Sequence, residues 1–185
     1  MARTESTMLA LGSLAPNFTL ADVVSGKVVK RDDFSGGKGL LVMFICPHCP
    51  YVKHIEKALG KLGADYADKS LGIVAISSND VVAYPQDGPD GMRVQAEMYG
   101  FHFPYLLDET QEVAKAYQAA CTPDFFLFDD RFALIYRGQF DASRPHSDVP
   151  VTGETLRAAL DAVLEGKPVP ADQRASLGCN IKWKS

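Results

Sequence analysis

The stretch Leu41-Val42-Met43-Phe44-Ile45-Cys46-Pro47-His48-Cys49-Pro50 decides the fold, because it joins a strand pattern to two cysteines and then to a helix pattern. The continuous apolar run 40–45 is typical of a strand buried on both faces of a parallel sheet. Beyond the cysteines, apolar residues at 52, 55, 59 and 62 recur at helical spacing. Two cysteines at such a junction can be a redox pair, half of a metal site, or an attacking thiol with its resolving partner.

The two prolines that follow the cysteines bear on where the helix begins. A residue before proline is disfavoured from helical backbone angles, so Cys46 and Cys49 are both biased toward extended or turn conformations. Proline itself is well tolerated as the first helical residue. We therefore expect the helix to begin at Pro50, with Cys49 as its N-cap and Cys46 exposed in the preceding turn. The alternative is a helix that begins at Pro47 and is kinked at Pro50.

Composition and charge limit the class of protein. The chain has 185 residues, of which 46% are hydrophobic and 23% charged, as in ordinary globular proteins, and we expect one domain over 1–185. A net charge of −4 gives no reason to expect nucleic acid or an anionic lipid surface as a partner. No apolar run approaches the roughly 18 residues that a membrane helix requires. With no convincing signal peptide, a cytoplasmic location is expected.

The remaining pattern predicts an α/β fold with a mixed central β-sheet flanked by helices. Short strands around 18–20 and 28–29 predict an N-terminal β-hairpin, and a second hairpin is expected near the end of the sheet. The tail, about 167–185, follows the last helix. The expected strands cover 18–20, 28–29, 40–45, 71–76, 104–107, 125–128 and 132–136, and the expected helices cover 52–62, 92–99, 110–118 and 156–164.

Three stretches resemble the thioredoxin-fold redoxins of the AhpC/TSA (peroxiredoxin-like) branch. They are 12–20 with Gly26-Lys27, the Cys46-Pro47-His48-Cys49 loop, and 122–127 with Tyr136-Arg137-Gly138. The likeness covers the core, about residues 12–165, and is greatest to the subgroup with Cys-x-His-Cys-Pro and a Gly-Cys-Asn-Ile-Lys-Trp tail, here 178–183. The resemblance implies a thioredoxin-like fold, a cis-proline at Pro123, preceded by Thr122, and a loop there that faces the cysteines.

The resemblance also implies roles for the two cysteines. In disulfide exchange within this fold, the first cysteine attacks and the second releases the mixed disulfide, so Cys46 is the expected attacker and Cys49 the resolver. The positive end of the helix dipole should stabilise a Cys46 thiolate, and a protonated His48 would add positive charge beside it. Cys121 should lie near the loop, as a small buried filler or as a redox thiol. Cys179 would come close only if the tail docks, for which Ile181 and Trp183 are the apolar anchors.

Two other functions stay open. A thiol-dependent peroxidase of this branch sets its cysteine in Pro-x-x-x-Thr-x-x-Cys, but Gly39 and Met43 occupy those positions here. Arg137 is the candidate guanidinium for such a site.

The second alternative is a metal-binding or redox-sensing module. It would use Cys46 and Cys49 with His48 or His54, and Cys121 as a third ligand, although no second Cys/His pair with zinc-ligand spacing follows. Two buried structural thiols are the remaining interpretation. We expect no metal, because that second pair is missing, and no organic cofactor, because no dinucleotide or phosphate-binding motif is present.

The preferred interpretation is a thiol–disulfide oxidoreductase that cycles Cys46 and Cys49 between dithiol and disulfide. Its expected partners are protein or small-molecule thiols and disulfides, and an external reductant. Under the peroxidase alternative, peroxides would also be substrates.

Overall fold

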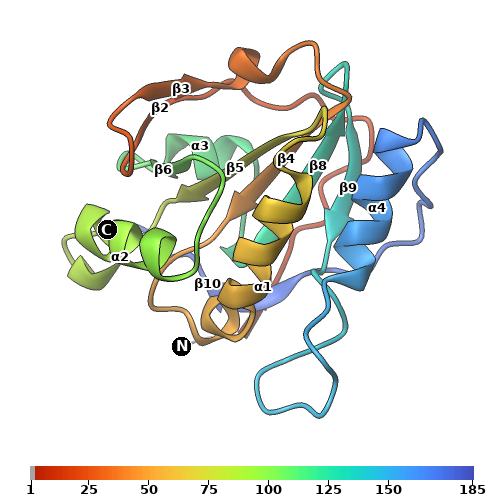
Figure 1. Ribbon diagram of the computed structural model, residues 1–185. Coiled ribbons are helices and arrows are strands. Elements are labelled where there is room, and N and C mark those ends of the chain that lie inside the picture. Colours follow the sequence, from red (N-terminus) through yellow and green to blue (C-terminus); the bar gives the residue numbers. More distant parts are fainter. Residues whose placement is uncertain (1–2) are drawn as a thin grey trace.

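A mixed β-sheet forms the centre of the computed structural model, which describes residues 3–185 (Figure 1). The strand order is β3-β2-β6-β5-β4-β8-β9. Strand β4 pairs in parallel with β5, and β5 with β6, whereas β2, β3, β8 and β9 join by antiparallel pairing. The strands of this sheet are β2 (Thr19–Asp22), β3 (Val28–Lys30), β4 (Gly39–Phe44), β5 (Gly72–Ser77), β6 (Tyr105–Leu107), β8 (Asp124–Asp129) and β9 (Leu134–Gly138).

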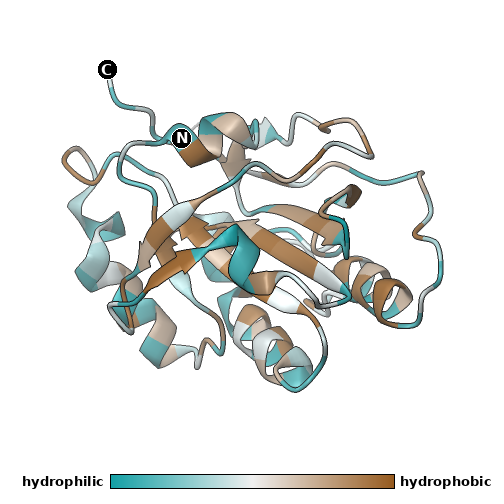
Figure 2. Ribbon diagram, turned by 90° about the horizontal axis from the view of Figure 1, so that it is seen from above, coloured by the Kyte–Doolittle hydropathy of each residue, from teal (hydrophilic) through white to brown (hydrophobic). Residues whose placement is uncertain are grey.

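Helices cover both faces of the sheet. Helices α1 (Pro50–Tyr66), α2 (Pro89–Met98) and α4 (Glu154–Leu164) pack on the face that carries Leu41 and Met43. Helix α3 (Glu112–Ala116) packs on the opposite face, against Val42 and Phe44. Successive residues of β4 point to opposite faces of the sheet, and both faces are covered, so every residue of the strand is buried. Figure 2 shows the hydrophobic strands enclosed between the helices. Two short 3₁₀ helices, η1 (Arg31–Phe34) and η2 (Pro85–Asp87), complete the helical segments of the described chain.

This architecture confirms the predicted α/β class and the buried strand before the cysteines. Both expected hairpins are present, as β2–β3 and β8–β9. Helix α2 begins three residues earlier than the apolar pattern indicates, because Pro89 occupies its first position. Among residues 3–185, no helix has both the length and the apolar character needed to cross a membrane.

A second, three-stranded sheet lies beside the first and includes the C-terminal segment. Its order is β1-β10-β7, formed by β1 (Arg3–Glu5), β10 (Leu177–Asn180) and β7 (Cys121–Thr122), with antiparallel pairing throughout. The segment after residue 167 was expected to be a tail, and the strand within it was not predicted. Ile181 anchors it as expected and is buried. The expectation for Trp183 was wrong: its side chain is 42% exposed and its ring lies 5.9 Å from Lys115 Nζ.

Candidate active site

The two cysteines lie in the turn between β4 and α1. Helix α1 begins at Pro50, and Cys49 is its N-cap, with extended backbone angles of φ −66° and ψ 124°. This confirms the predicted helix start and excludes a helix that begins at Pro47. The conformational restriction that each proline places on the residue before it accounts for the position of the boundary.

The predicted exposure of Cys46 was wrong. Cys46 is 1% exposed and Cys49 is 0% exposed. The two thiols belong to the core cluster on the α1 side of the sheet, which also includes Cys179 of β10. The covering segments come from distant parts of the chain: the cis-proline loop, η2 and β10. The resemblance to redoxins implies that the cis-proline loop faces the cysteines, but the sequence pattern does not indicate that η2 and β10 cover them as well.

The loop of Thr122 and Pro123 faces the cysteines, and the peptide bond between these two residues is cis, as predicted. The Thr122 hydroxyl lies 3.5 Å from Cys46 Sγ, and the Thr122 carbonyl oxygen lies 3.2 Å from Cys49 Sγ. Thr122 therefore contacts both cysteines, one through its side chain and the other through its backbone. Cys121 is buried, and its thiol is directed at the Pro123 carbonyl oxygen at 3.6 Å.

Hydrogen bonding divides the charge unequally between the two thiols. The pKa of Cys49 is lowered to about 5, chiefly because the Cys46 thiol donates a hydrogen bond to its sulfur, with further help from the Cys179 thiol. The pKa of Cys46 is raised well above its ordinary value by the same hydrogen bond, by burial and by the Asp87 carboxylate. The positive end of the α1 dipole lies at this N-cap and also favours negative charge on Cys49. The direction of the Cys46 pKa shift is opposite to the expected stabilisation of a Cys46 thiolate, and that role stays a prediction.

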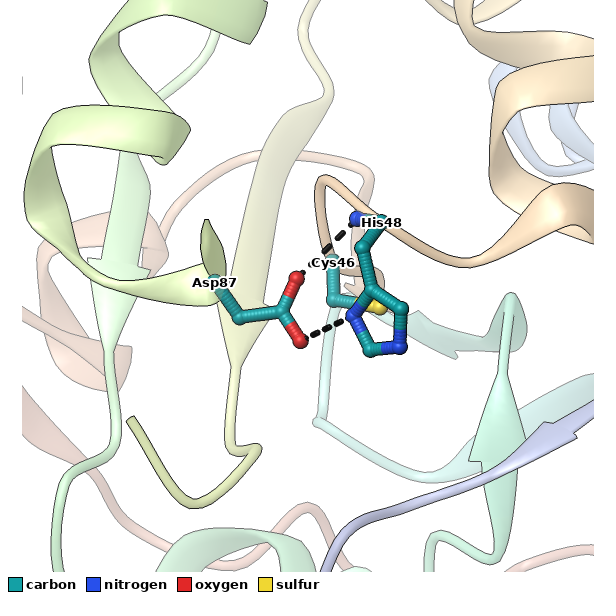
Figure 3. Close-up of side chains that lie close together, drawn as sticks. All are labelled: Cys46, His48 and Asp87. Atoms are coloured by element: carbon teal, nitrogen blue, oxygen red, sulfur yellow. Dashed lines mark hydrogen bonds and ion pairs between the residues drawn. The ribbon is translucent and has the colours of Figure 1, made fainter. Parts of the chain in front are cut away.

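Asp87 completes the site and was missed by sequence reasoning. It is fully buried at the end of η2, and one carboxylate oxygen accepts the His48 backbone N–H at 3.0 Å. The other oxygen bonds to His48 Nδ1 and accepts the Asn79 side-chain amide at 2.8 Å. Figure 3 shows this carboxylate holding His48 in place next to Cys46. The His48 ring also stacks on Tyr84, with centroids 5.5 Å apart. No signal in the Pro- and Gly-rich segment 79–91 distinguishes Asp87 from its other aspartates.

Cys46, His48 and Asp87 are the candidate metal ligands in the described part of the chain. Cys46 Sγ, a ring nitrogen of His48 and a carboxylate oxygen of Asp87 all lie within 4.8 Å of one another. However, both oxygens of Asp87 already take part in hydrogen bonds, and His48 Nδ1 is one of the partners. A metal ion would have to displace these bonds, so the donor set fits a hydrogen-bonded dyad better than a metal site. His54 is held elsewhere, by the Ser143 hydroxyl at 3.0 Å.

Two more of the predicted site residues have contrasting positions. Cys179 lies beside Cys49, because β10 docks against the cis-proline loop. Arg137 is occupied away from the cysteines: its guanidinium donates to the Leu9 carbonyl at 2.7 Å and to the Gln173 side chain at 2.9 Å. None of the hydrogen bonds found within residues 3–185 joins Arg137 to Cys46.

A surface groove reaches the site from the side of His48. Its walls come mainly from α1 and α2, and the His48 side chain, 14% exposed, is part of its lining. Pro47 lines the same groove, next to Cys46 in sequence.

Comparison with known proteins agrees with this geometry. Residues 11–137 match the AhpC/TSA family. Thiol-disulfide oxidoreductase ResA from Geobacillus thermodenitrificans is 29% identical over 126 residues, which is 68% of this chain and 67% of that protein.

Three solved structures extend the comparison. A crystal structure of an uncharacterized conserved protein from Geobacillus kaustophilus is 54% identical, with a TM-score of 0.97 and coverage of 100% of this chain and 97% of the other. A hypothetical protein from Sinorhizobium meliloti 1021 is 48% identical, with a TM-score of 0.96 and coverage of 98% and 99%. A putative thiol:disulfide interchange protein DsbE from Chlorobium tepidum shares the fold at 20% identity, a TM-score of 0.66 and coverage of 84% and 99%. The chain therefore belongs to the AhpC/TSA family and has a thioredoxin-like fold.

Proposed function

We propose that the protein is a thiol–disulfide oxidoreductase whose working couple is Cys46 and Cys49. The observation that carries the proposal is the placement of both thiols at the start of α1, where Thr122 of the cis-Pro123 loop contacts each of them. Two sulfurs in this relation can form and break a disulfide without rearrangement of the sheet. Support also comes from the relative named as a thiol-disulfide oxidoreductase.

The first chemical step uses the hydrogen bond between the cysteines. Cys46 attacks one sulfur of a substrate disulfide while its proton passes to the Cys49 thiolate. The substrate S–S bond breaks, a bond from Cys46 to the first substrate sulfur forms, and the second substrate sulfur leaves as a thiolate. Cys49 is the base nearest to the attacking thiol. Because the pKa of Cys46 is raised and that of Cys49 is lowered, the proton leaves Cys46 only as the new S–S bond forms.

The second step resolves the mixed disulfide. Cys49 gives its proton to the departed thiolate and attacks Cys46 Sγ, so that the first substrate sulfur leaves and the Cys46–Cys49 disulfide forms. The substrate has gained two electrons and the protein has lost two. The Thr122 hydroxyl, next to Cys46, stabilises negative charge on sulfur as the proton moves. An external thiol reductant restores the dithiol. Its identity, and the cytoplasmic location, stay predictions.

The peroxidase alternative has less support in the geometry. Met43 stands where the peroxidase pattern has a threonine, and its side chain is packed in the core below the loop. Arg137 is bonded to Leu9 and Gln173. A Cys46 oxidation rate with hydrogen peroxide no faster than that of free cysteine would exclude peroxidase function.

The reduction potential of the Cys46–Cys49 pair tests the proposed function. The protein is equilibrated in glutathione buffers from reducing to oxidising, with Cys179→Ser as a control that removes the neighbouring thiol. We expect a two-electron transition with a Cys46–Cys49 disulfide in both proteins. The proposal fails if no such disulfide forms at any glutathione ratio.

A further inference from the structure

We propose that Cys179 is a third redox thiol of this site, presented to Cys49 by β10 as a built-in substrate. The proposal rests on the thiol–disulfide chemistry proposed above. It concerns a strand that the AhpC/TSA match does not include, because that match ends at residue 137.

The register of β10 places Cys179 at the site. Cys179 pairs with Thr122 and Asn180 pairs with Cys121, in antiparallel orientation. The Ser176 hydroxyl donates to the Pro123 carbonyl at 2.6 Å, and the Ile181 backbone N–H donates to the Ala120 carbonyl at 3.1 Å. The segment thus adds a strand along the edge that leads to the cis-proline, which is how an extended peptide binds an exposed sheet edge. Here the edge is occupied by the chain itself.

Gly178 permits this close approach. A Cβ atom at this position would lie 1.9 Å from the Thr122 carbonyl oxygen and 2.6 Å from the carbonyl carbon. Both are backbone atoms, so no side-chain movement can relieve the contact. The absence of a side chain at residue 178 therefore allows β10 to lie against Thr122 and brings its neighbour Cys179 to the cysteine loop.

The Cys179 thiol is in contact with Cys49. Both residues belong to the same buried cluster, Cys179 is 4% exposed, and the interaction of the two thiols lowers the pKa of Cys49 and raises that of Cys179. Burial raises the pKa of Cys179 to about 12, so at neutral pH it is the proton donor in this contact. Cys121 makes a useful comparison: it is equally buried on the neighbouring strand, but its thiol is directed at the Pro123 carbonyl.

The contact allows a disulfide to move within the chain. From the Cys46–Cys49 disulfide, Cys179 attacks Cys49 Sγ, the bond to Cys46 breaks, and the Cys49–Cys179 bond forms. Cys46 leaves with the proton that Cys179 gives up, so electrons and protons balance without an outside oxidant. The result is a free Cys46 thiol beside a stored disulfide. Cys49 is fully buried, so the strand thiol is held beside it in the folded protein, whereas an outside thiol reaches it only when the site opens locally.

Disulfide mapping in a Cys46→Ser variant tests the inference. The variant is oxidised in oxidised glutathione, quenched in acid, digested without reduction and mapped by mass spectrometry. We expect the Cys49–Cys179 peptide as the main linked product, at least tenfold above any Cys49–Cys121 link in the same digest. Cys121→Ser in the same background is the matched control and should leave the yield unchanged. In the Cys46→Ser/Cys179→Ser variant, Cys49 should carry glutathione instead.

The outcomes separate this inference from the proposed function. A Cys46→Ser protein in which Cys49 carries glutathione and Cys179 stays a free thiol overturns the third-thiol role. If the Cys46–Cys49 disulfide still forms in Cys179→Ser, the oxidoreductase proposal stands in that case. Near- and far-ultraviolet circular dichroism shows whether each variant is folded. A linked product that forms only in 6 M urea also contradicts the inference, because the folded register would then have no part in it.

Discussion

Replacement of Gly178 by alanine should open the site. The new Cβ would lie 1.9 Å from the Thr122 carbonyl oxygen, whereas ordinary contact begins at 3.4 Å, so β10 has to move by about 1.5 Å. The hydrogen bond from Ile181 to Ala120, now 3.1 Å, cannot withstand a shift of that size, since such bonds weaken steeply beyond about 3.2 Å. The strand therefore loses its pairing with β7 next to the cis-proline.

The magnitude follows from the bonds lost. Each hydrogen bond contributes about 1 kcal/mol net, and forced overpacking costs about 1–3 kcal/mol, so a cost near 2 kcal/mol is reasonable. Because each 1.4 kcal/mol is about a factor of ten, the population with β10 detached should increase roughly 30-fold. Reagents reach Cys49 mainly through such local opening. Its alkylation rate should increase by the same factor.

The assay is iodoacetamide labelling of the reduced protein, with Cys49 and Cys179 quantified separately by mass spectrometry. Gly37→Ala is the matched control, because a Cβ there meets its nearest atom, the Ser70 carbonyl oxygen, at an ordinary 3.4 Å. Thermal unfolding of each variant distinguishes local opening from loss of the fold. If Gly178→Ala is folded and its Cys49 reacts within twofold of the wild-type rate, then β10 does not control access to Cys49, and the reasoning is refuted.

Three further predictions concern charge. Asp87→Asn removes a carboxylate that raises the pKa of Cys46, so this pKa should fall and Cys46 should be alkylated faster at pH 8. An unchanged or higher pKa of Cys46 would show that the Asp87 carboxylate does not act on this thiol. Cys46→Ala removes the main interaction that lowers the pKa of Cys49, so the pH midpoint of its thiolate absorbance at 240 nm should rise from about 5. An unchanged midpoint would show that another group determines the pKa of Cys49. Burial raises the pKa of Asp124 from 3.8 to about 7, so between these values the folded protein holds a proton that the unfolded chain has lost. The free energy of unfolding should therefore fall with increasing pH across that window, and urea titrations of Asp124→Asn should show a smaller fall; an equal fall in both proteins would rule out Asp124 as its source.

Local chemistry made part of the site predictable. The start of α1 follows from the prolines at 47 and 50, because the restriction on the preceding residue acts within a few bonds. The buried character of β4 follows from its unbroken apolar run. The cis bond before Pro123 was expected from the resemblance to redoxins, since base rates for proline favour the trans form.

Contacts between distant segments made the rest unpredictable. The burial of Cys46 depends on Asp87 and on β10, which lie far from it in sequence, and neither segment carries a periodic pattern that marks it as cover. The error for Trp183 came from a general preference of tryptophan for burial. In the structure Ile181 takes the buried position and Trp183 is left at the surface, next to Lys115.

The strand β10, which lies between β1 and β7, is the last element of the described fold in sequence. It therefore also determines when the cysteines become covered during synthesis. The hydrogen bond from Ser176 to Ser6 spans 170 residues, and β10 leaves the ribosome after every other element of the described fold. Until then, Cys46, Cys49 and Cys121 have no strand over them, and contacts of such high sequence separation form late. A growing chain therefore passes through a stage in which its thiols are open to wrong pairing. Rapid docking of the last strand would end that stage, so the burial of the cysteines protects the newly made protein as well as the mature one.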